Sequence, residues 1–284
     1  MGRKSYRSTW GNIIIIIFMA VVAIFMALPL VYTITTAFKP MNELFLYPPK
    51  FFVRNPTMKN FRDLFSAMNS SYIPFSRYLF NSVLVSVVGS IGHVLIAAMA
   101  AYAFAKHKFP GSKFLFNMVV FSLMFSGYVT GVPRFIIMSK MKVLDSYAAL
   151  ILPMLAGSLG LYLLKQFMEQ MVVDETLESA RIDGAGEFRI LWSIVMPSVK
   201  PGWLTLILLS FNFSWGDIGS PSLYIQTEGL KTLPLALSYV QAGGIARMGA
   251  GAANALLIML PPVIIFIITQ SNVIETMKSS GMKG

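Results

Sequence analysis

Long apolar runs are the feature that most constrains what this 284-residue chain can fold into. A helix needs about 20 apolar residues to cross the roughly 30 Å of hydrocarbon in a bilayer. Windows of about that length lie near residues 12–37, 78–105, 114–136, 147–165, 202–218 and 254–274. Backbone groups that face lipid must be paired within their own segment, and the ten-residue alternation of a membrane barrel is not evident. The sequence therefore predicts an all-α polytopic membrane protein with six transmembrane helices.

Composition narrows the function classes. The chain is 56% hydrophobic and 12% charged, whereas soluble domains carry about a quarter charged residues. It has no cysteine, and its two histidines, His93 and His107, are too far apart for a recognisable metal cluster. The net charge of +11 comes from residues at the ends of apolar segments, without interleaved aromatics. These are predicted to be membrane-flanking charges, so neither a metal site nor nucleic-acid binding is expected.

The placement of lysine and arginine predicts the topology. Arg3, Lys4 and Arg7 precede the first apolar run, and the tight connection 106–113 reads KHKFPGSK. Both clusters favour the cytoplasm, so the N- and C-termini are predicted to be cytoplasmic. The first run is too long for a signal peptide and lacks a small-residue cleavage site, so it is predicted to be a retained span.

Three connections are long. Segments 38–77 and 219–253 are predicted to be external, and the first should contain a short helix near Met58–Ala67. The segment 166–201 is predicted to be internal. Within it, Asp174 suits a helix N-cap, a short helix follows from Glu175 to Asp183, and Gly184 and Gly186 can end it with positive φ. Apolar residues then recur at helical spacing, which predicts a second, amphipathic helix along the membrane surface before Pro197. They are Phe188, Leu191, Trp192 and Val195.

The same segment carries a spaced motif. Glu178, Ser179 and Ala180 are followed after three residues by Gly184 and, nine residues later, by Ile194, Met196 and Pro197. This resembles the loop of ATP-binding-cassette importer permeases, E-A-A, three residues, G, nine residues, I-x-L-P. Ser179 and Met196 depart from it with side chains of similar size. The order of spans, the long segment after the first helix and the SSGMKG end are similar to the MalG-type subunit of carbohydrate importers of uptake type 1.

The resemblance implies the organisation of the chain. Residues 1–77 would form an N-terminal transmembrane helix and external loop, residues 78–274 a MetI-like five-helix core, and residues 275–284 a cytoplasmic tail. It implies a bacterial cytoplasmic membrane location and four kinds of partner: a second, MalF-like permease, an ATPase dimer, an extracellular solute-binding protein, and a sugar or oligosaccharide.

A short helix between two spans can dock in a groove of a separate ATPase and pass on its motion. The candidate coupling residues are Glu178, Ser179, Ala180, Asp183, Gly184 and Pro197. The alternative is a surface loop with glycine turns and no partner. No Gly-Lys dipeptide occurs, so the chain lacks a G-x-x-x-x-G-K-[ST] phosphate loop. ATP and magnesium are therefore expected in the partner ATPase, with no cofactor bound by this chain.

Polar residues inside or at the ends of spans are candidates for the substrate pathway. His93 lies mid-span and could bind a sugar, or it could be a neutral histidine tied to a neighbouring helix. Asn212, Trp215 and Asp217 could form a sugar-binding surface, or Trp215 could be an interface residue and Asp217 a helix-end group. The resemblance alone implies that Gln241, Gly243 and Gly244 contact the binding protein.

Two other classes remain open at this point. A secondary transporter or channel would be expected to show internal repeats or charged midspan residues, and neither is evident. A membrane enzyme would be expected to show H-E-x-x-H, G-x-S-x-G or a histidine–carboxylate cluster, and the spans carry none. A small solute other than sugar is the alternative substrate.

Overall fold

The computed structural model describes residues 9–69, 72–241 and 247–281, and these contain helices and no strand. The all-α prediction is thus confirmed for the described chain. The helices are α1 (Thr9–Ala37), α2 (Met41–Leu44), α3 (Lys59–Asn69), α4 (Phe75–Lys106), α5 (Ser112–Ser122), α6 (Gly127–Lys140), α7 (Tyr147–Leu155), α8 (Ser158–Met171), α9 (Asp174–Ile182), α10 (Glu187–Ile190), η1 (Leu191–Val195), α11 (Met196–Ser198), α12 (Lys200–Gly216), α13 (Gly219–Tyr224), η2 (Glu228–Leu230), α14 (Leu233–Gln241) and α15 (Met248–Gly281).

The chain divides into two compact units, one of residues 1–70 with 240–257 and the other of residues 71–239 with 258–284. In the first, no residue of the apolar window of α1 is buried, as suits a helix surrounded by lipid or partner helices. The segment after α1 is held by buried polar groups. The Asn60 side chain of α3 donates to the carbonyls of Ala37 and Lys39, and the Glu43 carboxylate accepts the N–H groups of Arg54 and Asn55. The short helix predicted near residues 58–67 is present as α3.

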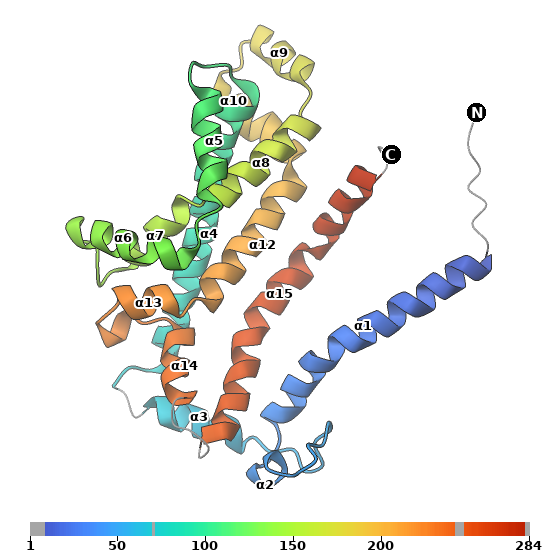
Figure 1. Cartoon of the computed structure of the whole chain (residues 1–284), viewed down its shortest axis with the longest axis vertical. Coiled ribbons are helices and arrows are strands. Elements are labelled where there is room, and N and C mark those ends of the chain that lie inside the picture. Colours follow the sequence, from blue (N-terminus) through green and yellow to red (C-terminus); the bar gives the residue numbers. More distant parts are fainter. Residues whose placement is uncertain (1–8, 70–71, 242–246, 282–284) are drawn as a thin grey trace. The chain divides into compact units, whose positions relative to one another are not determined.

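In the second unit, α4 packs along α7, α8 and α12 (Figure 1). Ala97, Ala98 and Ala101 on α4 are almost fully buried, and these small side chains let the neighbouring backbones approach closely. Leu164 of α8 and Leu206 of α12 fill the space between the helices. Figure 1 also shows α9 and α10 at one end of α4, and α13 and α14 at the other.

Four helical segments are long and apolar enough to cross a membrane: Trp10–Ala37, Phe75–Lys106, Tyr147–Met171 and Met248–Gln270. A fifth is counted if α10–α11 and α12 are taken together, although they are bent by 83°. The last helix continues to Gly281, so most of the predicted tail 275–284 is helical.

The predicted third span, 114–136, is not one continuous helix. It consists of α5 and α6 separated by a turn at residues 123–126, and α6 leaves the direction of α5 (Figure 1). The N–H groups of Leu123, Met124 and Phe125 bond to carbonyls three residues earlier, which tightens the helix and ends it. A new helix then starts on the Ser126 carbonyl. Because hydropathy is unbroken across this turn, the apolar pattern did not reveal the break, and the prediction of a single helix was wrong.

His93 fixes three parts of the core together. Its Nε2 lies 3.0 Å from the carbonyl oxygen of Gly157, at the break between α7 and α8, and its Nδ1 lies 2.8 Å from the hydroxyl of Ser210 on α12. A carbonyl can only accept, so Nε2 carries the proton and, in a neutral ring, Nδ1 accepts from Ser210. A Cβ on Gly160 of α8 would lie 2.4 Å from Nε2 and 3.0 Å from Leu206. The imidazole therefore occupies space that only glycine leaves open.

Gly160→Ala should destabilise the protein by about 1–3 kcal/mol, because His93 is held by two hydrogen bonds and cannot yield. The measurement is the thermal unfolding midpoint of the purified protein in detergent. Gly131→Ala on α6 is the matched control, since nothing lies within 4 Å of its Cβ. That change should raise stability by about 0.5–1 kcal/mol. A Gly160→Ala protein that unfolds at or above the wild-type midpoint would contradict the packing described here.

Candidate functional site

The segment that carries the spaced motif is anchored on the end of α4. Lys106 of α4, whose side chain is 6% exposed, lies 2.6 Å from the Asp174 carboxylate and donates to the Val172 carbonyl at 2.8 Å. The hydrogen bond and charge of Lys106 hold the pKa of Asp174 below its ordinary value. Asp174 is the first residue of α9, and its carboxylate pairs with Lys106 instead of capping the helix, so the N-cap prediction was wrong. The start of α9 is thereby fixed to α4.

The end of α9 is fixed by a second carboxylate, that of Glu187 at the start of α10. The Tyr102 hydroxyl donates to it at 2.6 Å, and the Arg181 guanidinium donates at 2.7 Å. His107 Nε2 lies 3.2 Å from the same carboxylate. Hydrogen bonds from Arg181 and Tyr102 lower the pKa of Glu187 to about 2. The carboxylate is therefore charged at neutral pH and joins α4, α9 and α10.

Of the predicted coupling residues, several lie on the open side of α9. Glu178, Ser179, Asp183 and Gly184 are exposed, while Ala180 is half-buried against the core. Beside them, Ile182 is 86% exposed. Leu177, on the opposite side, is 1% exposed and anchors the helix. The predicted helix is thus present, one residue earlier than expected at each end.

The glycines that follow α9 behave differently from each other. Gly184 has φ of +80°, as predicted for a residue that ends a helix, with open space around it. Gly186 has φ of −72° and precedes α10, so the positive φ predicted for it was wrong.

The second predicted helix is present, and part of its apolar side is buried in the core of the chain. Leu191 and Val195 are buried in the same core as Leu164, whereas Phe188 is 69% exposed. Phe188 lies in α10, whereas Leu191 and Val195 are the first and last residues of η1, a turn of π-helix. Pro197 is exposed in α11, next to the 83° bend before α12, where the Trp203 indole donates to the Met196 carbonyl.

A half-open cavity of about 670 Å³ lies beside the His93 contacts. Its wall combines aromatic side chains, hydroxyls and two opposite charges. These include Phe125, Arg134, Ser158, Phe213, Ser214 and Asp217. Such a mixture offers apolar faces and hydrogen-bonding groups to a polar organic solute.

The structure separates the four predicted pathway residues. His93 lines the cavity, yet both its ring nitrogens are engaged by the protein. Asp217 also lines it and accepts the N–H of Ser220. Trp215 is 1% exposed, stacks on Phe211 and donates to the Ile258 carbonyl, so its ring is buried within the chain and is not among the cavity residues. Asn212 is exposed and is not among the cavity residues.

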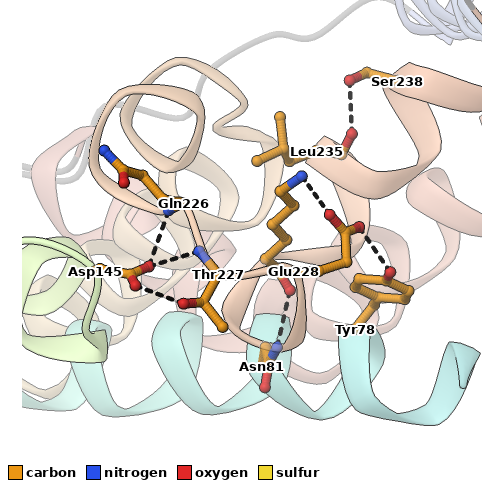
Figure 2. Close-up of polar contacts among 9 residues, drawn as sticks. Tyr78, Asn81, Asp145, Gln226, Thr227, Glu228, Leu235 and Ser238 are labelled. Atoms are coloured by element: carbon orange, nitrogen blue, oxygen red, sulfur yellow. Dashed lines mark hydrogen bonds and ion pairs between the residues drawn. The ribbon is translucent and has the colours of Figure 1, made fainter. Parts of the chain in front are cut away.

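At the other end of α4, side chains hold the segment 225–233 in place by hydrogen bonds (Figure 2). The Asn81 amide donates to the carbonyls of Gly229 and Lys231, and the Tyr78 hydroxyl donates to Glu228. Asp145, between α6 and α7, accepts the N–H groups of Gln226 and Thr227 and the Thr227 hydroxyl. The Thr227 hydroxyl and N–H lower the pKa of Asp145. Gln241, a predicted contact for a binding protein, ends α14, while Gly243 and Gly244 lie outside the described residues.

Sequence reasoning missed Tyr102, Lys106, Arg134 and Glu187. Lys106 stood out only as a topology charge in the 106–113 connection. Glu187 pairs with a tyrosine 85 positions away, and no local pattern marks that contact.

The structure and this surface together define an all-helical membrane protein with a short, outward-facing helix anchored between its spans. A family model described as "Binding-protein-dependent transport system inner membrane component" matches residues 93–278. The chain belongs to this family. It is therefore a permease subunit of an ABC importer and not an enzyme, and the secondary-transporter and membrane-enzyme alternatives are set aside.

Individual relatives are also permease proteins of transport systems. The chain is 29% identical to the galactooligosaccharides transport system permease protein GanQ of Bacillus subtilis, over 99% of this chain and 98% of that protein. It is 28% identical to the sn-glycerol-3-phosphate transport system permease protein UgpE of Yersinia enterocolitica, over 72% and 73% of the two chains. A crystal structure of a bacterial ABC transporter for import of the acidic polysaccharide alginate contains a chain of the same fold. Its TM-score is 0.76 at 18% identity, over 94% of this chain and 98% of that one.

Asp145→Ala should destabilise the second unit by about 1–3 kcal/mol, because two backbone N–H groups and a hydroxyl lose their acceptor. The measurement is the unfolding midpoint in detergent at neutral pH. Thr227→Val removes one of these bonds and should cost about 0.5–1.5 kcal/mol. Because the folded pKa of Asp145 is lowered, its contribution is complete at neutral pH and is lost as the pH falls through that pKa. Equal unfolding midpoints for Asp145→Ala and wild type would refute the role of Asp145 in holding the segment 225–233.

Proposed function

We propose that this chain pairs with a second permease to form the import pathway for a sugar or oligosaccharide, coupled to an ATPase dimer that docks on α9. A solute-binding protein would deliver the substrate. The observation that carries the coupling role is the exposed face of α9 between two anchors on α4. A partner that moves this face moves α4 with it.

The proposed topology has six crossings, with both termini cytoplasmic in a bacterial inner membrane. Four crossings are the long apolar segments, and α12 with its bent entry is the fifth. The sixth is a broken crossing made by α5, the turn at 123–126 and α6. The charges at Lys106, Lys108 and Lys113 support placing the α9 end of α4 in the cytoplasm.

The carbohydrate assignment is supported by the relative named for galactooligosaccharide transport and by the cavity wall. Arg134 and Asp217 offer donors and acceptors to hydroxyl groups, and Phe125 and Phe213 offer faces for sugar C–H groups. Another small solute delivered by a binding protein is the alternative. ATP and magnesium would be held by the ATPase, with no cofactor in this chain.

Ile182→Lys should abolish retention of the ATPase, because it places a charge in the centre of the proposed docking face without touching the core. The measurement is co-purification of the ATPase with tagged permease from membranes. This change tests docking better than Gly184→Arg, which would also strain a backbone at positive φ. Lys140→Leu, exposed on α6, is the control and should leave retention intact. Full retention by Ile182→Lys would rule out docking on this face.

Arg134→Leu should lower uptake of the cognate sugar about tenfold, because a charge-assisted hydrogen bond to the solute is lost. ATPase retention should be unchanged. The measurement is initial uptake of the labelled sugar that the binding protein retains, with Lys140→Leu as the same charge loss outside the cavity. Wild-type uptake by Arg134→Leu would exclude the cavity from the pathway.

A further inference from the structure

The coupling helix α9 has nine residues, which is too short to be stable alone in water. Its geometry must come from tertiary contacts. Leu177 supplies the buried apolar contact, Lys106 fixes the first turn, and Arg181 in the last turn reaches Glu187. Removing the contact at the last turn would leave the helix held only through its first half, by Lys106 and Leu177.

Glu187 is the point at which three elements meet. Its carboxylate accepts from Tyr102 on α4 and from Arg181 on α9, and it belongs to α10. The distances of 2.6 and 2.7 Å are those of charge-assisted hydrogen bonds, which are stronger than neutral ones. His107, the residue after α4, stands edge-on to the Tyr102 ring and 3.2 Å from the carboxylate.

The burial of Tyr102 makes this contact costly to lose. Tyr102 is 5% exposed and packs in the core that also contains Leu177 and Ile190. Its hydroxyl donates to the Glu187 carboxylate, which is 46% exposed, so removal of that carboxylate takes away the acceptor that links this buried ring to α10. A charged residue on the surface loop is thus tied to a buried group of a membrane helix.

We propose that Glu187 is a positioning residue that makes α9 and α4 one rigid body. This rests on the proposed coupling role of α9. With Glu187 in place, a pull on the exposed face of α9 is transmitted to α4. Without Glu187, α9 pivots about its Lys106 anchor and about the connection through Gly184. A displacement of α9 then deforms the loop and is not transmitted to α4.

The absence of cysteine from the sequence permits a direct test. Cysteines are introduced at Thr176, exposed on α9 and outside the candidate coupling residues, and at Met99, 43% exposed on α4, and both are spin-labelled. The distance distribution between the labels is measured in the purified complex with the second permease and ATPase. It is recorded without nucleotide and after trapping with Mg-ATP and vanadate. The variants are Glu187→Ala and Tyr102→Phe.

Glu169→Ala is the matched control. Glu169 is an exposed glutamate whose 2.6 Å ion pair with Lys165 is close in length to the 2.7 Å pair of Glu187 with Arg181 but lies within the single helix α8. Wild type and control should give one narrow distribution, unchanged by trapping. In Glu187→Ala the ratio of docked to released α9 should fall about tenfold, which broadens the distribution and makes it shift on trapping.

Tyr102→Phe should broaden the distance distribution less than Glu187→Ala does. The double variant should give a distribution no broader than that of Glu187→Ala, because both changes remove the same Tyr102–Glu187 hydrogen bond. The ATPase should still co-purify with Glu187→Ala, which separates a loss of positioning from a loss of folding. A distribution for Glu187→Ala as narrow as that of the control in both states would overturn the proposal. Failure of the wild-type chain to retain the ATPase would instead sink the coupling role, and the comparison without nucleotide would still decide whether Glu187 holds α9.

Discussion

Polar side chains hold helix α4 at three positions along its length, and the geometry of the second unit depends on these contacts. Asn81 secures the segment 225–233 at one end, His93 secures α8 and α12 near the middle, and Tyr102 and Lys106 secure α9 and α10 at the other end. A polar group among apolar helices has no water to satisfy it, so an unpaired one costs free energy. The His93 contacts therefore fix position more tightly than apolar packing alone, whereas Asp174 and Glu187 at the far end are 73% and 46% exposed.

The same helix carries small residues where its neighbours come closest. Ala97, Ala98 and Ala101 allow close approach, and Gly160 leaves room for the His93 ring. The neighbouring helices are interrupted between α7 and α8 and between α11 and α12. The cavity lies beside the first of these breaks. A rigid α4 with breaks in its neighbours is a structure in which motion at α9 can change the shape of the cavity.

Periodic and spaced features of this chain were readable from the sequence. Apolar windows gave the positions of the long helices, and the spacing from Glu178 to Pro197 indicated the family and the segment that we propose for coupling. The break at residues 123–126 was not readable, because it arises from a switch in backbone hydrogen bonding within an unbroken apolar run. Trp215 was misplaced for a related reason, since its position in a polar cluster at a helix end did not reveal that its ring is buried and bonded to Ile258.

Long-range polar pairs were also beyond sequence reasoning. His93 bonds to residues 64 and 117 positions away, and Tyr102 to one 85 positions away. Any of several glutamates in the segment could have been the partner of Tyr102, and only the turn geometry after Gly184 selects Glu187. The motif thus identified the exposed helix for which we propose docking of the ATPase, while the structure identified the residues that hold this helix.

The most direct measurement is a pair of cryo-electron microscopy structures of the assembled transporter, one without nucleotide and one trapped with Mg-ATP and vanadate. When the two structures are superposed on α4, α9 and α10 should also overlay, although the neighbouring helices move. The Tyr102–Glu187 and Lys106–Asp174 contacts should be intact in both states. A trapped structure in which α9 has separated from α4 and both contacts are broken would contradict the account.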